Sequence, residues 1–114
     1  MKRETDDYIQ DIIEAIDKIA VFIESMDFEA FSNDDKTIFA VVRAIEIIGE
    51  ASKNIGEEIR NANSEIPWKE IAGMRDKLAH AYFGISVNRV WETAFVEIPK
   101  LKQAFETVIE KNKE

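Results

Sequence analysis

Residues 5–26 have the sequence TDDYIQDIIEAIDKIAVFIESM, and this stretch decides the fold class. Its apolar residues recur at steps of three and four, which is the period of an amphipathic helix. These residues are Ile9, Ile12, Ile13, Ile16, Ile19, Ile23 and Met26. Thr5 can cap the start, and Asp6 and Asp7 suit the positive end of the helix dipole. We therefore expect one long helix from about Thr5 to Met26.

The same period continues after a short interruption. Residues 27–33 are expected to form a loop or a single turn, and Ser32 to Asp34 offer cap candidates for a second long helix. Its apolar positions are Ile38, Val41, Val42, Ile45, Ile48, Ile55 and Ile59. The Asn- and Ser-rich stretch 61–67 then ends in a proline, a residue suited to a first helical turn. We expect a third helix over about 67–79.

A fourth helix is predicted after Gly84 and Ser86, which mark a break and a new cap. Its apolar face comprises Val87, Val90, Trp91, Ala94 and Phe95. Pro99 should kink or restart it, and the charged end at 111–114 should fray. Short links between long helices favour antiparallel neighbours. The predicted fold is all-α, an up-and-down antiparallel bundle of four main helices plus a short fifth element.

Composition limits what this bundle can do. The chain has 114 residues, of which 46% are hydrophobic and 33% charged, so we expect a single domain over 1–114. It has no cysteine, which excludes disulfides, thiolate nucleophiles and zinc-thiolate sites. No apolar stretch approaches the roughly 18 residues of a membrane span, and acidic residues follow Lys2 and Arg3 where a signal peptide would be apolar. We expect a cytoplasmic protein.

The charge is unevenly distributed. The formal net charge is −8, which argues against indiscriminate binding to nucleic-acid backbone. The window 68–90 nevertheless has four basic and two acidic residues, a local charge of +2. This window also holds the only histidine, His80.

Metal and cofactor chemistry is not expected. Helical bundles often bind two metal ions through Glu-x-x-His pairs, but Lys77 stands three residues before His80. Glu46 and Glu50 share a helix face, and such acidic pairs are usually solvated. Glycine-rich phosphate loops and serine-nucleophile elbows are also missing. We assign no metal and no cofactor.

The most informative segment is 74–84, MRDKLAHAYFG. On an ideal helix the side chains of Arg75 and His80 would lie about 140° apart, and those of His80 and Tyr82 about 160° apart. They could converge on one pocket if the helix loosens near His80. Simpler roles exist for each residue: a histidine at a helix end, an arginine in a surface ion pair, and a tyrosine packed on the core.

The pattern R-x-x-x-x-H-x-Y at Arg75, His80 and Tyr82 resembles the signature of the HEPN superfamily, in particular the HepT-like ribonuclease toxins. Three further blocks in the same order resemble this family and extend the match over most of 38–101. They are Ile47-Ile48-Gly49-Glu50-Ala51, Ile66-Pro67-Trp68, and Tyr82-Phe83-Gly84 followed by Val90-Trp91.

The resemblance implies metal-independent RNA cleavage by attack of a ribose 2′-hydroxyl on the neighbouring phosphate. His80 would serve proton transfer, because both of its forms are populated near neutrality, and Arg75 would bind the phosphate. Asp76 matches a polar residue that often follows the family's arginine, and Glu50 could orient the site from a neighbouring helix. The expected ligand is an RNA substrate.

The resemblance also implies two partners. One is a second copy of the chain, because acid–base cleavage is best served by two groups and each chain has one histidine. The other is a cognate minimal nucleotidyltransferase antitoxin, which would transfer AMP to Tyr82. The alternative function is a non-catalytic HEPN-type helical dimer that binds a nucleotide or such a partner.

Four residues outside the motif are expected to be structural. Trp68 and Trp91 lie on apolar helix faces, so we expect them to pack in the core rather than stack on RNA bases. Gly49 and Gly73 each cost roughly 1 kcal/mol within a helix, which suggests close approach of a neighbouring helix.

Overall fold

The computed structural model describes residues 4–79 and 86–113, with the side chains of 75–79 and 112–113 excepted. All regular structure in this part is helical, so the prediction of an all-α bundle is confirmed. The described helices are α1 (Thr5–Phe22), α2 (Phe28–Ser32), α3 (Asp35–Lys53), α4 (Glu57–Ala62), α5 (Trp68–Ala79), α6 (Val87–Glu92) and α7 (Lys102–Lys113). A π-helical turn, Thr93–Glu97, and a 3-10 turn, Pro99–Leu101, join α6 to α7.

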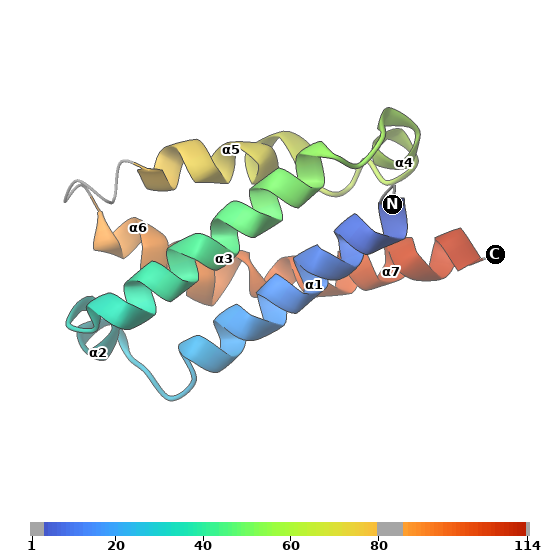
Figure 1. The fold of residues 1–114 in the computed structure, drawn as a ribbon. Helices are drawn as coiled ribbons and strands as arrows, with labels where there is room; N and C mark the ends of the chain where they lie inside the picture. The colour runs from blue at the N-terminus through green and yellow to red at the C-terminus, as the bar shows by residue number, and fades with distance from the viewer. Residues whose placement is uncertain (1–3, 80–85, 114) are drawn as a thin grey trace.

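The long helices alternate in direction (Figure 1). α3 packs against both α1 and α5, and α7 packs against α1. The α6–α7 segment serves as the fourth main helix, as expected, because the chain keeps one direction through its two irregular turns. The carboxyl end of α5 therefore lies at the same end of the bundle as the starts of α3 and α6 (Figure 1).

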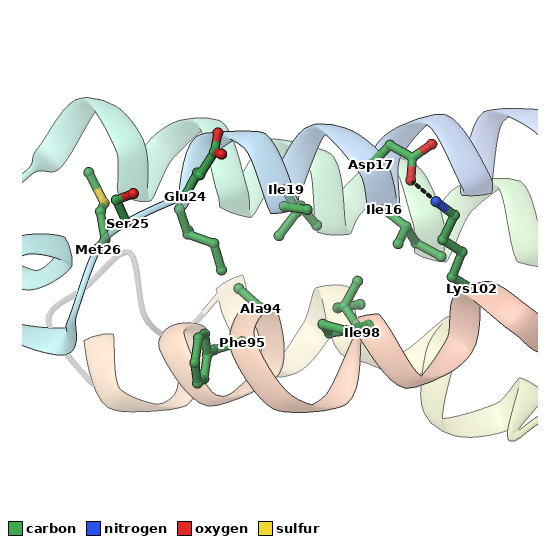
Figure 2. A pocket seen from close by; sticks show the side chains of 13 residues that line it. Ile16, Asp17, Ile19, Glu24, Ser25, Met26, Ala94, Phe95, Ile98 and Lys102 are labelled. Carbon is green, nitrogen blue, oxygen red and sulfur yellow. Dashed lines mark ion pairs between the residues drawn. The ribbon is translucent and has the colours of Figure 1, made fainter.

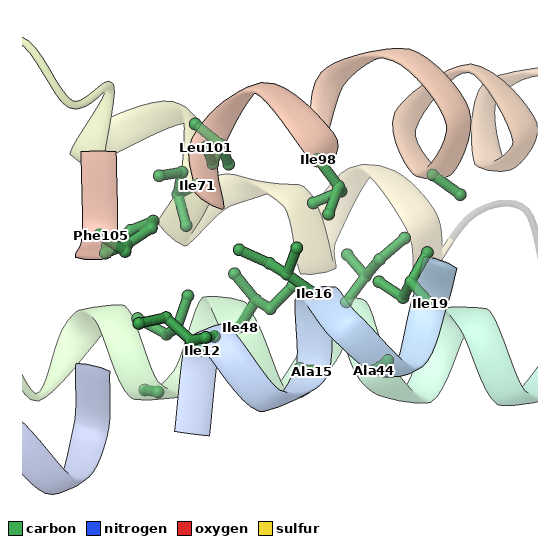
Figure 3. Close-up of a cluster of buried hydrophobic side chains, with 14 of the residues drawn as sticks. Ile12, Ala15, Ile16, Ile19, Ala44, Ile48, Ile71, Ile98, Leu101 and Phe105 are labelled. Atoms are coloured by element: carbon green, nitrogen blue, oxygen red, sulfur yellow. The ribbon is translucent and has the colours of Figure 1, made fainter. Parts of the chain in front are cut away.

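One layer of the core shows why these helices assemble. Ile12 of α1, Ile48 of α3, Ile71 of α5 and Phe105 of α7 are all fully buried (Figure 3). Each such side chain contributes roughly 1.5–3 kcal/mol by leaving water. Ala15 and Ala44 are also buried, and they let α1 and α3 approach closely. The three- and four-residue spacing thus places one residue from each helix in the layer.

The first helix starts where predicted but is capped differently. Glu4, not Thr5, is the N-cap residue, and its main-chain N–H donates to Asp7 Oδ2 at 3.0 Å. α1 ends at Phe22, four residues before the predicted end. Ser25 has a φ of 65°, in the left-handed region, so the chain turns before Met26.

The second predicted helix was too long, because the structure breaks it into α3 and α4. Asn54 ends α3, and its side-chain Nδ2 donates to the Glu50 carbonyl at 3.0 Å. Gly56 then starts α4. Ile55 is buried within the turn between α3 and α4, so the apolar period continues across the break. The period alone therefore does not indicate where α3 ends.

Proline 99 explains the irregular joint between α6 and α7. It has no N–H to donate to the carbonyl of Phe95, so the α-helical ladder cannot continue through it. The N–H of Ile98 instead bonds the carbonyl of Thr93 at 2.8 Å, five residues back. The predicted kink at Pro99 is confirmed as this π turn followed by a 3-10 turn.

Both tryptophans pack as predicted. Trp68 lies against Phe105, with ring centroids 5.6 Å apart, and Trp91 stacks on Phe95 at 4.9 Å. The expectation for Gly73 was wrong, because a Cβ atom there would meet nothing within 4 Å. Gly49 is buried within α3.

Candidate active site

The described part of the predicted motif lies in the second half of α5. Positions 75 and 76 belong to the second half of this helix, which begins at Trp68 directly after Pro67. His80 and Tyr82 lie outside the described residues, as do the side chains of Arg75 and Asp76. The structure therefore gives the helix position of Arg75 and Asp76 and leaves convergence of the motif side chains as a prediction.

The elements around this end of the bundle are fixed by side-chain caps. Asp27 accepts from the N–H of Ala30 at 2.8 Å at the start of α2. Asp34 accepts from Thr37 at 3.0 Å, and Ser86 accepts from Arg89 at 2.9 Å. The caps predicted at 32–34 and at Ser86 are confirmed, and Ser86 sets the first residue of α6 after the motif.

An aromatic cluster ties α6 to α2 at the same end. Trp91 contacts Phe31, with centroids 5.1 Å apart, and Phe28 at 6.5 Å in an edge-on arrangement. Phe31 is fully buried, while Phe95, which stacks on Trp91, is 56% exposed. This packing holds the segment that leaves the motif against the rest of the bundle.

Glu50 lies away from the carboxyl end of α5. It is exposed in the last turn of α3, two residues beyond the buried Ile48, and so points away from the core. Because α3 and α5 are antiparallel, that turn lies beside the first half of α5 (Figure 1). The fold thus places Glu50 and the end of α5 at different levels of the bundle.

An apolar groove runs between α1 and the turns that follow α6 (Figure 2). Its volume is about 530 Å³, and Ile19, Ala94 and Ile98 form part of its wall. Lys102 Nζ lies 2.8 Å from Asp17 Oδ1 at one end, and this contact raises the pKa of Lys102 above its ordinary value. Its polar lining comprises Asp17, Lys102, Glu24 and Ser25, none of which belongs to the predicted motif.

A second hollow, of about 630 Å³, lies where α4 meets the start of α5. Arg60, Ser64, Trp68 and Lys69 contribute to it. The sequence did not single out Arg60, because an arginine in a short, highly charged helix has no distinguishing pattern. The sequence feature that could have pointed to Lys69 is its place in the basic window 68–90.

No set of side chains able to hold a metal ion exists among the described residues. None of the described helices is long and apolar enough to span a membrane.

The chain is similar to known proteins over most of its length. The family model described as "Ribonuclease HepT-like" matches residues 12–108. A "Probable ribonuclease HepT" of Thermococcus cleftensis is 55% identical, over 93% of this chain and 96% of that protein. A "Putative RNase" of Methanocaldococcus jannaschii is 48% identical over 95% and 89% of the two chains. A "Putative RNase" of Caldanaerobacter subterraneus is 42% identical over 93% and 95%. No solved structure matches the chain.

Proposed function

The chain belongs to the HepT-like ribonuclease family, and from this premise we propose that it is an endoribonuclease that cleaves RNA without a metal ion. The observation that carries the proposal is the family match over 12–108, which includes Arg75, His80 and Tyr82 in order. The placement of position 75 in the second half of α5 supports it, because the buried Ile71 anchors this helix in the core.

The proposed reaction is an internal transfer at phosphorus. The ribose 2′-oxygen forms a bond to the adjacent phosphorus, and the bond from phosphorus to the 5′-oxygen of the next nucleotide breaks. A base removes the 2′-hydroxyl proton, and an acid protonates the leaving 5′-oxygen. His80 supplies this proton transfer, and Arg75 neutralises charge on the non-bridging phosphate oxygens. Asp76 would have a supporting role beside Arg75, whereas Glu50 would act only through intervening residues, because it lies at another level of the bundle.

The distribution of charge over the bundle supports an RNA substrate despite the net charge of −8. α1 has five carboxylates and one lysine, a net charge of −4, which is half of the excess. α5 has three basic and two acidic residues, a net charge of +1. α3 packs between these two helices, so the acidic helix is kept away from α5 (Figure 1).

The active unit is proposed to be a homodimer. The transfer needs one group that accepts a proton and one that donates it, and each chain has a single histidine. Twofold symmetry supplies a second His80 without any further residue type.

Control of the activity is proposed to come from a minimal nucleotidyltransferase antitoxin, which would make the chain the toxin of a toxin–antitoxin pair. The Tyr82 phenol oxygen would attack the α-phosphorus of ATP and release pyrophosphate. The AMP group would add negative charge two residues from His80 and compete for Arg75. Both effects oppose entry of RNA.

Purified protein incubated with single-stranded RNA tests the proposed function. Cleavage should persist in EDTA and yield ends with a 2′,3′-cyclic phosphate or its hydrolysis product. His80→Ala and Arg75→Ala should lose cleavage, whereas Arg43→Ala, at an exposed arginine of α3 paired with Glu46, should keep it. Cleavage that requires magnesium or survives His80→Ala contradicts the mechanism. Binding of nucleotide or partner with no cleavage by the wild type indicates the non-catalytic alternative.

A further inference from the structure

The hollow between α4 and the start of α5 combines features that suit one nucleotide. It has a volume of about 630 Å³ and is lined by two cationic residues, Arg60 and Lys69. Neutral polar residues, Asn61 and Ser64, also line it, and Trp68 gives it an aromatic wall. Cations bind phosphate, and an aromatic ring accepts a stacked base of any identity.

Arg60 is the least explained part of this hollow. Its Nε–H is buried and has no hydrogen-bond partner within the described part of the chain. A buried donor without an acceptor costs free energy, more so on a charged group. The Nε–H itself is closed off from a ligand, whereas the terminal N–H groups of the same guanidinium form a planar fork that suits a phosphate oxygen.

Trp68 is held in place independently of any ligand. Its Nε1–H donates to the main-chain oxygen of Asn63 at 3.1 Å, and its ring meets Phe105 edge-on at 5.6 Å between centroids. The half-buried indole is therefore fixed before a base arrives, which lowers the entropic cost of stacking.

The hollow lies in line with the motif. Trp68 and Ala72 both line it, and positions 68, 72, 75 and 79 follow one another at steps of four, three and four along α5. Such positions form one stripe on a helix. A strand of RNA that follows this stripe runs from the Arg75 position to the hollow along α5.

The distance sets how many nucleotides are involved. Lys69 lies six residues before Arg75 and ten before Ala79, the neighbour of His80, which is about 9–15 Å along a helix. A stacked strand advances about 3.4 Å per nucleotide, so the two regions are roughly three to four nucleotides apart.

The charge of the hollow limits what it can bind. Glu57 and Glu70 also line it, so its net charge is zero and it cannot attract a polyanion from a distance. Carboxylates do accept hydrogen bonds from the amino groups of bases. The lining thus suits one phosphate with its base better than a bare anion.

On the basis of the proposed ribonuclease function, we propose that Arg60, Lys69 and Trp68 form an RNA-binding subsite that holds a nucleotide roughly three to four positions from the cleaved bond. The subsite takes part in substrate binding and has no part in the chemical step.

The test uses full-length protein and a single-stranded 2′-O-methyl RNA of ten nucleotides, which cannot undergo 2′-hydroxyl attack. Arg60→Gln and Lys69→Gln should each bind it roughly tenfold more weakly than wild type. The dependence of log affinity on log salt should become shallower by about 0.7 for each phosphate group that the variant no longer binds. Arg43→Gln is the matched control and should bind like wild type, because Arg43 lies on the outer surface of α3 with Glu46.

Two further measurements separate a subsite from a general effect of charge. A trinucleotide of the same chemistry is too short to reach the hollow from the motif, so it should bind the variants and the wild type equally. In Trp91→Phe, Trp68 is the remaining tryptophan, and the ten-nucleotide RNA should quench its fluorescence whereas the trinucleotide should not. Thermal melting checks that every variant is folded.

If Arg60→Gln and Lys69→Gln both bind the ten-nucleotide RNA as tightly as wild type, the proposed subsite is wrong. The proposed ribonuclease function is unaffected by that result. The proposed subsite is also wrong if Arg43→Gln loses as much RNA affinity as Arg60→Gln and Lys69→Gln do. The same holds if these two variants bind the trinucleotide more weakly than wild type. A wild-type protein that neither binds nor cleaves RNA overturns both proposals. Trp68 fluorescence that changes with protein concentration in the absence of RNA would show that a second copy of the chain covers the hollow. The hollow would then be a protein interface instead.

Discussion

The indole N–H of Trp68 donates a hydrogen bond to the main-chain oxygen of Asn63, five residues earlier, with a nitrogen-to-oxygen distance of 3.1 Å. Asn63 is itself buried, its Nδ2 donates to the Ile59 carbonyl at 2.9 Å, and its Oδ1 accepts from Lys111 Nζ at 3.4 Å. These bonds join the end of α4, the start of α5 and the last turns of α7. The link before α5 is thereby fixed although it has few apolar residues of its own.

Trp68→Phe removes this hydrogen bond and keeps an aromatic ring against Phe105. The Asn63 carbonyl loses the indole donor in a part-buried position but still accepts from the Ile66 N–H at 3.1 Å, so the free energy of unfolding should fall by about 0.5–1.5 kcal/mol. Urea denaturation followed by circular dichroism measures the change. A loss of zero would mean that water replaces the indole N–H at no cost.

Phe105 and Phe95 form a matched pair for core packing. Phe105 is fully buried, and Phe95 is 56% exposed. Phe105→Ala should lower the free energy of unfolding by roughly 3–5 kcal/mol, because it leaves a cavity between helices. Phe95→Ala should cost much less, since it gives up one stacked ring pair with Trp91 at the surface. Similar losses of stability in the two variants would contradict this difference in burial.

Asp34 should make stability depend on pH in acid. Hydrogen bonds from Thr37, first from its N–H at 3.0 Å, hold the pKa of Asp34 below its ordinary 3.8. Because the pKa is lower in the folded state, ionised Asp34 contributes its full stabilisation above pH 3.8. This contribution disappears as the pH falls through the pKa of the folded state. Asp34→Asn keeps a capping oxygen and does not titrate. Its free energy of unfolding should therefore run parallel to that of wild type at neutral pH and fall less steeply below pH 3.8.

The proposed dimer has a direct measurement. Light scattering at micromolar concentration should give about twice the chain mass of 13.1 kDa. His80→Ala should have the same mass as wild type, because the histidine is proposed to act in proton transfer and not in assembly. A wild-type mass of one chain would remove the argument that a second His80 completes the site.

The proposed control by AMP transfer predicts a covalent mark on Tyr82. Co-expression with a minimal nucleotidyltransferase should raise the intact mass by one or more AMP groups and suppress RNA cleavage. Tyr82→Phe should gain no mass and should remain able to cleave RNA in the presence of the same enzyme. A mass increase retained in Tyr82→Phe would place the modification elsewhere.

The sequence identified the family and most of the helices. Pro67, Ser86 and Asp34 act through their own main-chain neighbours, so their effects on helix starts can be read locally. The predicted motif could also be recognised from the sequence, because Arg75, His80 and Tyr82 form a pattern of residue type and spacing.

The break between α3 and α4 needed tertiary structure. Ile48 and Ile55 keep the helical period across Asn54 because Ile55 is buried within the turn as well as it would be within a helix. The apolar period indicates which residues are buried on folding. A buried residue in a turn can fit this period as well as one in a helix.

The sequence by itself thus determined an all-α bundle and the residues of its expected chemistry, because caps, prolines and amphipathic spacing act over a few neighbouring residues. Tertiary structure alone decided that Phe105 is buried while Phe95 is exposed, and that Arg60 meets Trp68 in one hollow. The physical reason is that exposure and hollows depend on which helix packs against which. That choice is made by the sum of many weak contacts between residues far apart in the chain.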